Sequence, residues 1–267
     1  MKKLSKAYLG LVLMFLYVPI FVLIIFSFNT TKSRTVLSGF TLDWYIRLFK
    51  NEVIMTSLMN TILIAVAASI ASTILGTTAA IGINSMKKLP RTIVMNITNF
   101  PIINPEIVTG VSLMLLFVFF AARMHFEFGF WTLLIAHITF DVPYVILNVM
   151  PKFRQMDPFL YEAAQDLGCN PIKAFFKVVL PEIMPGIISG FLMSFTYSLD
   201  DFIISYFTCG PNTQTLPITI YSMTRRKVSP EINALSTIIF LIVVIVLIVK
   251  NIIERKHSAK IRKEDMA

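Results

Sequence analysis

Long apolar runs without charged residues constrain this chain more than any other feature of its sequence. The first of them, Leu9–Phe28, contains no charged residue at all. A bilayer core about 30 Å thick needs roughly 20 apolar residues for one helical crossing. Lipid offers no hydrogen bonds to the backbone, so a crossing segment of this kind forms a helix. The sequence therefore predicts an all-α integral membrane protein.

Six apolar runs are spaced along the 267 residues, which predicts six transmembrane helices in a single domain covering residues 1–267. The first run is longer than the roughly 7 to 15 residues of a signal-peptide core and lacks a small-residue cleavage site, so we expect an uncleaved first helix. The predicted crossings are Leu9–Phe28, Ser57–Met86, Thr92–Ala121, Trp131–Met150, Ile183–Thr208 and Asn233–Ile253.

The positions of the basic residues predict the orientation. Fifteen Lys and Arg residues lie in the N-terminus, the 87–91 turn, the 151–182 loop and the C-terminal tail, against eight in the remaining loops. The positive-inside rule then places both termini and the long loop in the cytoplasm. Anionic lipid accounts for the net charge of +9, so no nucleic-acid partner is expected. Cys169 and Cys209 fall on opposite faces in this topology, so neither a disulfide nor a metal site follows.

The long loop at about 151–182 has a pattern of its own. Good helix formers run up to Gly168, a Cys-Asn-Pro turn follows, and Ile172–Val179 resumes a helix that Leu180-Pro181 closes. Glu162 and Asp166 lie one turn apart on the same face. Two short helices joined by a corner suit a groove in another protein. An amphipathic connector lying on the membrane surface is the alternative.

Residues in this loop and elsewhere resemble a known family. Glu162-Ala163-Ala164, Gly168 and Leu180-Pro181 stand at the spacing of the EAA loop of ABC importer permeases, with Val178 where that pattern commonly has isoleucine. Further segments resemble the permease subunits of spermidine/putrescine importers, so that the likeness extends over essentially the whole chain. These segments are Phe40–Tyr45, Ala136–Phe140, Ser198–Asp201 and Val228–Ala234.

This resemblance implies a type I importer permease with the MetI-like fold, in a bacterial cytoplasmic (inner) membrane. Two permease subunits, two ATPase subunits and an extracytoplasmic substrate-binding protein would move polyamines inward, with the second permease different from this one. The family would make the EAA loop the coupling element that docks on the ATPase, through Glu162, Ala163, Ala164, Gly168, Leu180 and Pro181.

The chain itself carries no phosphate-binding G-x-x-x-x-G-K-[ST] loop. We therefore expect a transporter subunit rather than an enzyme, with no cofactor of its own, and with ATP and Mg used by the partner ATPase. Six helices are also few for enclosing a gated pathway, which agrees with pairing to a second permease.

Four acidic residues fall within the predicted crossings: Glu106, Asp141, Asp200 and Asp201. A charge near the bilayer centre costs about 2.5 to 3.5 kcal/mol on insertion scales, so such groups normally face a cavity and mark a transport path. Glu106 follows two prolines four residues apart, which favour a broken helix lining the pathway. A simple proline kink, with Glu106 bonded to a neighbouring helix, is the alternative.

The two adjacent aspartates are predicted to lie on one helix and to diverge by about 100°. At least one should face the cavity, while the other accepts bonds from Ser198, Ser205 or the partner subunit. Asp141 departs from the family pattern and ranks lower as a cargo ligand. His137 is interpreted as a packed interhelical donor rather than a proton relay or ligand.

An alkylammonium cargo offers charged heads to carboxylates and a methylene stem to aromatic rings. Ring packing and interface belts are the alternative role for the aromatic residues near the acids. The predicted substrate pathway consists of Glu106, Asp200, Asp201, Ser198, Trp44, Tyr197 and Tyr206.

Other functions remain as alternatives. An anion importer should show a basic or hydroxyl-rich lining, whereas this chain offers acids at depth, so a cationic cargo fits best. An ABC permease for another cationic or polar solute is the second hypothesis. A non-ABC cation channel or an intramembrane enzyme is the third, although the sequence lacks sets such as H-E-x-x-H and a selectivity loop.

Overall fold

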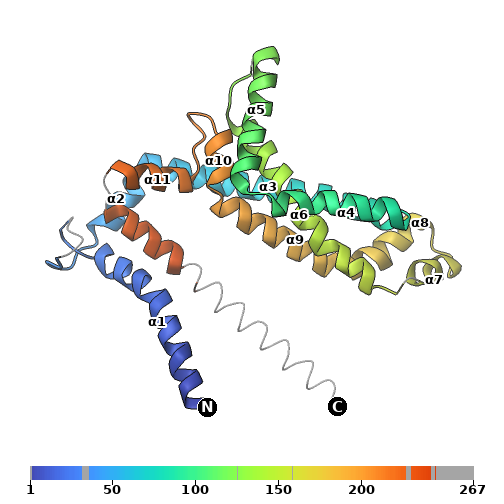
Figure 1. Ribbon diagram of the computed structural model, residues 1–267, viewed down its shortest axis with the longest axis horizontal. Helices are drawn as coiled ribbons and strands as arrows, with labels where there is room; N and C mark the ends of the chain where they lie inside the picture. Colours follow the sequence, from blue (N-terminus) through green and yellow to red (C-terminus); the bar gives the residue numbers. More distant parts are fainter. Residues whose placement is uncertain are drawn as a thin grey trace. The chain divides into compact units, whose positions relative to one another are not determined.

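The computed structural model describes residues 2–31, 36–124, 126–157, 159–226, 230–241 and 244, and within these ranges the secondary structure is helical, with a lone β-bridge between Asn29 and Phe40 (Figure 1). The chain divides into two compact units, one made of residues up to Met55 and from Ile220 onward, the other of Thr56–Thr219. The elements are α1 (Lys2–Ser27), α2 (Asp43–Lys50), α3 (Glu52–Ser85), α4 (Lys88–Ile103), α5 (Glu106–Met124), α6 (Phe130–Gln155), α7 (Leu160–Asp166), α8 (Pro171–Ala174), η1 (Phe175–Val179), α9 (Leu180–Asp200), α10 (Ile203–Thr208) and α11 (Leu216–Arg226).

Five helical stretches are long and apolar enough to cross a membrane. They are Tyr8–Ser27, Glu52–Ser85, Glu106–Met124, Phe130–Gln155 and Pro171–Asp200. The first, second and fourth predicted crossings each coincide with one of these stretches, with shifted ends. The fifth, Ile183–Thr208, is wrong as a single helix, because α9 ends at Asp200 and Ile203–Thr208 forms the separate helix α10. A shorter apolar helix, Pro230–Leu241, occupies the start of the sixth. The remainder of Asn233–Ile253, apart from residue 244, lies outside the described residues, as does the basic tail.

The third predicted crossing, Thr92–Ala121, is wrong as a single helix. Helix α4 ends at Ile103 and α5 begins at Glu106, while Asn104 between them is extended, with φ −73° and ψ 137°. A residue that precedes proline is pushed out of the helical region, and Pro105 supplies that constraint. The broken helix expected from the prolines is therefore confirmed, and Glu106 stands at the first turn of α5 rather than midway along a crossing.

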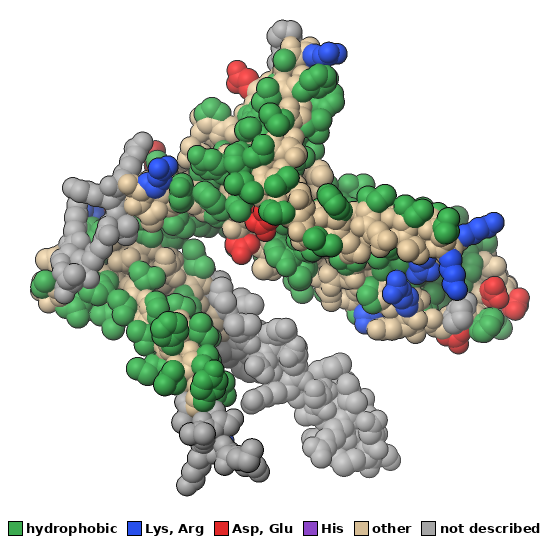
Figure 2. Space-filling view, viewed as in Figure 1, with side chains coloured by type: hydrophobic (Ala, Val, Ile, Leu, Met, Phe, Trp, Pro, Cys, Tyr) green, Lys and Arg blue, Asp and Glu red, His purple; other side chains and the backbone are tan. Residues whose placement is uncertain are grey.

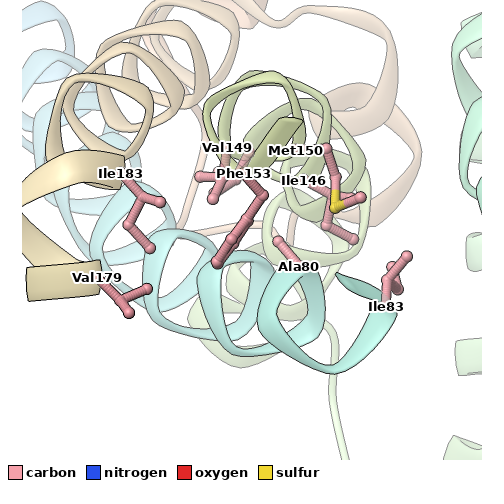
Figure 3. Packing of buried hydrophobic residues seen from close by; sticks show 9 residues of the cluster. Ala80, Ile83, Ile146, Val149, Met150, Phe153, Val179 and Ile183 are labelled. Atoms are coloured by element: carbon pink, nitrogen blue, oxygen red, sulfur yellow. The ribbon is translucent and has the colours of Figure 1, made fainter. Parts of the chain in front are cut away.

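Helix α6 is the central helix of the second unit. It packs along α9, and close approach is possible because a glycine stands at each contact: a Cβ at Gly190 would lie 3.1 Å from the Cα of Val145. At the same residue of α6, a Cβ at Gly76 of α3 would lie 2.6 Å from the Cβ of Val145. Figure 3 shows the adjoining apolar cluster, in which side chains from α3, α6 and α9 meet around Val149 and Phe153. The three helices form the closely packed apolar core of this unit.

The long loop folds as two short helices with a corner, as predicted. Gly168 adopts the left-handed conformation, with φ +86°, and Asn170 caps α8 by accepting a 2.7 Å hydrogen bond from the Lys173 amide. The predicted closure at Leu180-Pro181 is wrong, because the π-turn η1 runs directly into α9. Pro181 therefore lies within one continuous helical stretch, Pro171–Asp200, directly after the π-turn.

In the first unit, side chains tie the end of α1 to α2. The Trp44 indole donates a 2.7 Å hydrogen bond to the Asn29 carbonyl, and the Ser27 and Tyr45 hydroxyls lie 2.7 Å apart. The Phe28 and Phe40 rings stack with centroids 5.3 Å apart. Trp44 is buried and engaged in this packing, so its indole serves the local fold.

Candidate functional site

The helix α9 ends in an acidic pair. Its last helical residue is Asp200, and Asp201 is extended, with φ −60° and ψ 126°. The prediction that both aspartates lie on one helix and diverge by 100° is therefore wrong. The chain breaks between them and resumes in α10 after Phe202. The break separates the two carboxylates by changing the backbone direction rather than by helical rotation.

Asp201 is buried and caps the helix that follows it. Its Oδ1 accepts a 3.2 Å hydrogen bond from the Ile204 amide, and its Oδ2 accepts a 2.7 Å bond from the Ser205 amide. The first amides of a helix have no partner within it, so a carboxylate at this point satisfies them and complements the positive end of the helix. Asp201 is therefore engaged within its own chain.

His137 of α6 contacts serine side chains on both sides of the break. Its Nδ1 lies 2.6 Å from the Ser198 hydroxyl on α9, and its Nε2 lies 3.0 Å from the Ser205 hydroxyl on α10. The same Nε2 is 3.6 Å from Oδ2 of Asp201. The side chain is 1% exposed. His137 is thus the packed interhelical group that the sequence predicted, and Ser198 is its partner rather than an open lining residue.

Asp200 and Glu106, by contrast, are exposed. Helix α5, which begins with Glu106, packs on α10 at a glycine: a Cβ at Gly110 would lie 3.0 Å from the Phe207 ring and 3.5 Å from the Ile204 Cα. This packing brings Glu106 close enough to interact electrostatically with Asp200 and Asp201. Figure 2 shows acidic side chains at the foot of α5 amid apolar and uncharged atoms. Residues 92–122 and 178–224 contain no Lys or Arg, so no basic residue of these segments neutralises the exposed acids.

Aromatic rings lie beside this acidic region. Tyr144 of α6 and Tyr197 of α9 have ring centroids 4.4 Å apart, and Phe140 packs against both, at 5.2 and 6.2 Å. Tyr206 is 50% exposed and lies against Phe202. The predicted Tyr197 and Tyr206 thus flank the break in one unit. Trp44, predicted with them, belongs to the other unit.

Asp141 occupies a different place from the other three acids. It is 0% exposed, and within the described part of the chain neither carboxylate oxygen accepts a hydrogen bond of regular geometry. The Ser194 hydroxyl interacts with it from α9, and that hydroxyl lies 2.8 Å from Ser72 of α3. Asp141 is therefore enclosed by its own chain. Sequence reasoning missed this serine pair, because its members are 122 positions apart.

The EAA loop presents a mixed surface. Glu162, Ala163 and Gly168 are exposed, while Ala164 is buried beneath them. Large apolar side chains also face outward: Leu167 is 88% exposed and Ile172 69%. Sequence reasoning emphasised the acidic face and missed these two. Among the described residues, no group of three or more His, Cys, Asp or Glu side chains could hold a metal ion.

Some known proteins resemble this chain in sequence, and others resemble it in fold. The chain is 41% identical over 229 residues to the putrescine transport system permease protein PotI of Escherichia coli, covering 84% of this chain and 81% of that protein. It is 34% identical over 255 residues to the spermidine/putrescine transport system permease protein PotC of Haemophilus influenzae, covering 96% and 98%. A crystal structure of a bacterial ABC transporter involved in import of the acidic polysaccharide alginate superposes with a TM-score of 0.70 over 95% of each chain, at 15% identity.

That structural likeness, at low identity, shows the fold alone, which is the helical fold of ABC importer permeases. The family of binding-protein-dependent transport system inner membrane components matches residues 72–263. This match includes the broken helices, the acidic region and the EAA loop. The chain therefore belongs to the family of binding-protein-dependent transport system inner membrane components, the permease subunits of ABC importers.

Proposed function

We propose that this chain is the permease subunit of an importer for polyamines, with Glu106 and Asp200 as the carboxylates that meet the cargo. The observation that carries the proposal is the exposure of these two acids at the broken ends of α5 and α9. An ammonium group is satisfied by carboxylates, and the methylene stem of a polyamine by ring faces such as those of Tyr197 and Tyr206. Moderate binding of this kind lets a carrier release its cargo.

The relatives support the same cargo class. Both PotI and PotC are named for putrescine or spermidine transport, and each matches this chain over most of its length. The remaining parts of the transporter follow from this relationship. The chain would pair with a second, PotB-like permease, a dimer of PotA-like ATPase subunits that uses ATP and Mg, and a PotD-like substrate-binding protein on the outer side.

The loop 151–182 is proposed to be the coupling element for the ATPase, with both termini and this loop in the cytoplasm. Figure 2 shows basic side chains gathered at the end of the Thr56–Thr219 unit that bears α7 and α8, the charge that favours a cytoplasmic location. Closure of the ATPase dimer would move the loop. Because η1 joins the loop to α9 without interruption, that movement would reach the α9 break and so alternate the access of the pathway.

Uptake measurements test this proposal. The chain is expressed with its own transporter partners in cells that lack endogenous polyamine uptake, and accumulation of radiolabelled putrescine and spermidine is measured. We expect accumulation that unlabelled polyamines suppress. If neither polyamine accumulates above the level of cells without the transporter, the polyamine assignment is wrong.

Another organic cation is the second candidate, because exposed carboxylates and aromatic rings would also bind other ammonium compounds. Competition separates the two: a monoamine or a basic amino acid that suppresses uptake more strongly than putrescine or spermidine would favour this second cargo class.

A further inference from the structure

We propose that His137 is the positioning residue of the cargo pathway: it fixes the break between α9 and α10 and thereby orients both exposed carboxylates. The inference rests on the proposed function, since it takes Glu106 and Asp200 as the cargo carboxylates. His137 itself is 1% exposed and does not meet the cargo. It acts through the two helices that its ring nitrogens join.

The break needs an external support. Helix α10 has six residues, and a helix of this length is unstable without tertiary contacts. Asp201 supplies one support by bonding the Ile204 and Ser205 amides. This cap fixes the first turn of α10 relative to Asp201, but it does not connect α10 to α9. A group that contacts residues on both sides of the break is needed to set their relative direction.

His137 provides that connection. Ser198 lies two residues before the end of α9, and Ser205 is the third residue of α10. The imidazole lies between their hydroxyls, at 2.6 Å from one and 3.0 Å from the other. A neutral imidazole accepts a hydrogen bond at one nitrogen and donates at the other, so it can satisfy both serines at once. One side chain thus sets the separation of the two helix ends.

The support is itself rigid. His137 projects from α6, whose Leu133, Val145 and Val149 are each 0% exposed. The glycines of α3 and α9 let those helices pack closely against α6 at Val145. Side chains in closely packed interiors have little freedom to shift. The ring is therefore held by the best-packed helix of the unit.

Packing between α10 and α5 couples the position of α10 to that of Glu106. Ile204 of α10 is 1% exposed and lies in one apolar cluster with Leu113 and Phe117 of α5. Gly110, one turn after Glu106, lets α5 approach the backbone of α10. Asp200 adjoins the break directly. A displacement of α10 would therefore move the start of α5 and the end of α9 together, and with them both carboxylates.

Substitutions at His137 test the inference. His137→Leu removes both hydrogen bonds, whereas His137→Gln keeps an amide that can donate to one serine and accept from the other. Polyamine uptake is measured in the full transporter, with KM and Vmax normalised to the amount of this subunit in the membrane. We expect KM to rise about tenfold for His137→Leu and about threefold for His137→Gln, at similar normalised Vmax. A merely structural residue would lower the subunit amount and leave KM unchanged.

Ser72→Ala is the matched control, because it removes a buried interhelical hydroxyl pair of the same unit that includes neither hydroxyl bonded by His137. We expect its KM to match the wild type. If His137→Leu prevents assembly, Ser198→Ala and Ser205→Ala each remove one partner of the imidazole, and we expect KM to rise about threefold in each. Unchanged KM in both serine variants would overturn the inference.

Asp200→Asn in the same assay distinguishes a wrong positioning role for His137 from a wrong assignment of the cargo carboxylates. If Asp200→Asn raises KM while the His137, Ser198 and Ser205 variants leave it unchanged, the positioning role is wrong and the proposed function stands. If Asp200→Asn and Glu106→Gln both leave KM unchanged, the assignment of the cargo carboxylates is wrong, and the positioning inference falls with it.

Discussion

The backbone amide of Ser205 donates a 2.7 Å hydrogen bond to Oδ2 of Asp201, so this buried aspartate serves as a helix cap. Asp200, its neighbour in the chain, is exposed. The two adjacent carboxylates therefore have separable tasks: one stabilises the broken helix, and the other is free to meet a cation. Membrane-embedded acids are commonly assigned to transport as a group, whereas here the backbone decides which of them is accessible.

Substituting the two aspartates separately tests this division. Asp201→Ala removes the cap of α10 and should lower stability by about 0.5 to 2 kcal/mol, the usual effect of losing a capping side chain. Asp200→Ala should leave stability close to that of the wild type, since its side chain is exposed, but should raise the KM for polyamines. Thermal unfolding of the purified transporter in detergent and uptake kinetics provide the two measurements. A larger loss of stability for Asp200→Ala than for Asp201→Ala would contradict the division.

Asp141 should be dispensable for cargo binding, because it is 0% exposed and enclosed by its own chain. Asp141→Asn keeps the size of the side chain and a group able to bond Ser194. Burying a carboxylate that can ionise costs more free energy than burying a neutral amide, so the Asp141→Asn protein should unfold at the same temperature as the wild type or higher. We expect its KM to stay within about twofold of the wild-type value. A rise in KM as large as that expected for Asp200→Asn would instead show that Asp141 contributes to cargo binding.

The close contact between α3 and α6 should make Gly76 intolerant of a side chain. A Cβ at this position would lie 2.6 Å from the Cβ of Val145, whereas among the described residues nothing lies within 4 Å of a Cβ placed on Gly82 of the same helix. Overpacking a core typically costs about 1 to 3 kcal/mol. Gly76→Ala should therefore lower the unfolding temperature, and Gly82→Ala should leave it equal or raise it through better helix propensity. Equal behaviour of the two variants would contradict this packing.

Of the two helix breaks, the sequence predicts the one within Thr92–Ala121 but not the one at the acidic pair Asp200-Asp201. Apolar length located the long helices, and Pro105 located the break before Glu106, because both effects act locally along the chain. The break after Asp200 escaped prediction. No proline or glycine marks it in the sequence Leu199-Asp200-Asp201-Phe202, and it depends on hydrogen bonds that the Ile204 and Ser205 amides donate to Asp201.

Side-chain contacts between distant parts of the chain were also not predictable from the sequence. The Ser205 hydroxyl is 68 positions from His137, so the histidine could be interpreted as an interhelical donor but its partners could not be named. Likewise, the helix expected to end at Leu180-Pro181 continues through the π-turn η1 directly into α9.

The exposed apolar tip of the EAA loop should be needed for contact with the ATPase. Leu167 is 88% exposed and adjoins Gly168, whose left-handed backbone turns the chain between α7 and α8. Apolar residues left in water at a compact projection favour a protein partner, and a charge at the centre of such an interface is unfavourable. Leu167→Asp should reduce recovery of the ATPase with the permease by tenfold or more in mild detergent, with the permease itself still folded. Glu127→Gln, an exposed change on the predicted outer face, serves as the control. Full ATPase recovery with Leu167→Asp would show that this tip lies outside the docking surface.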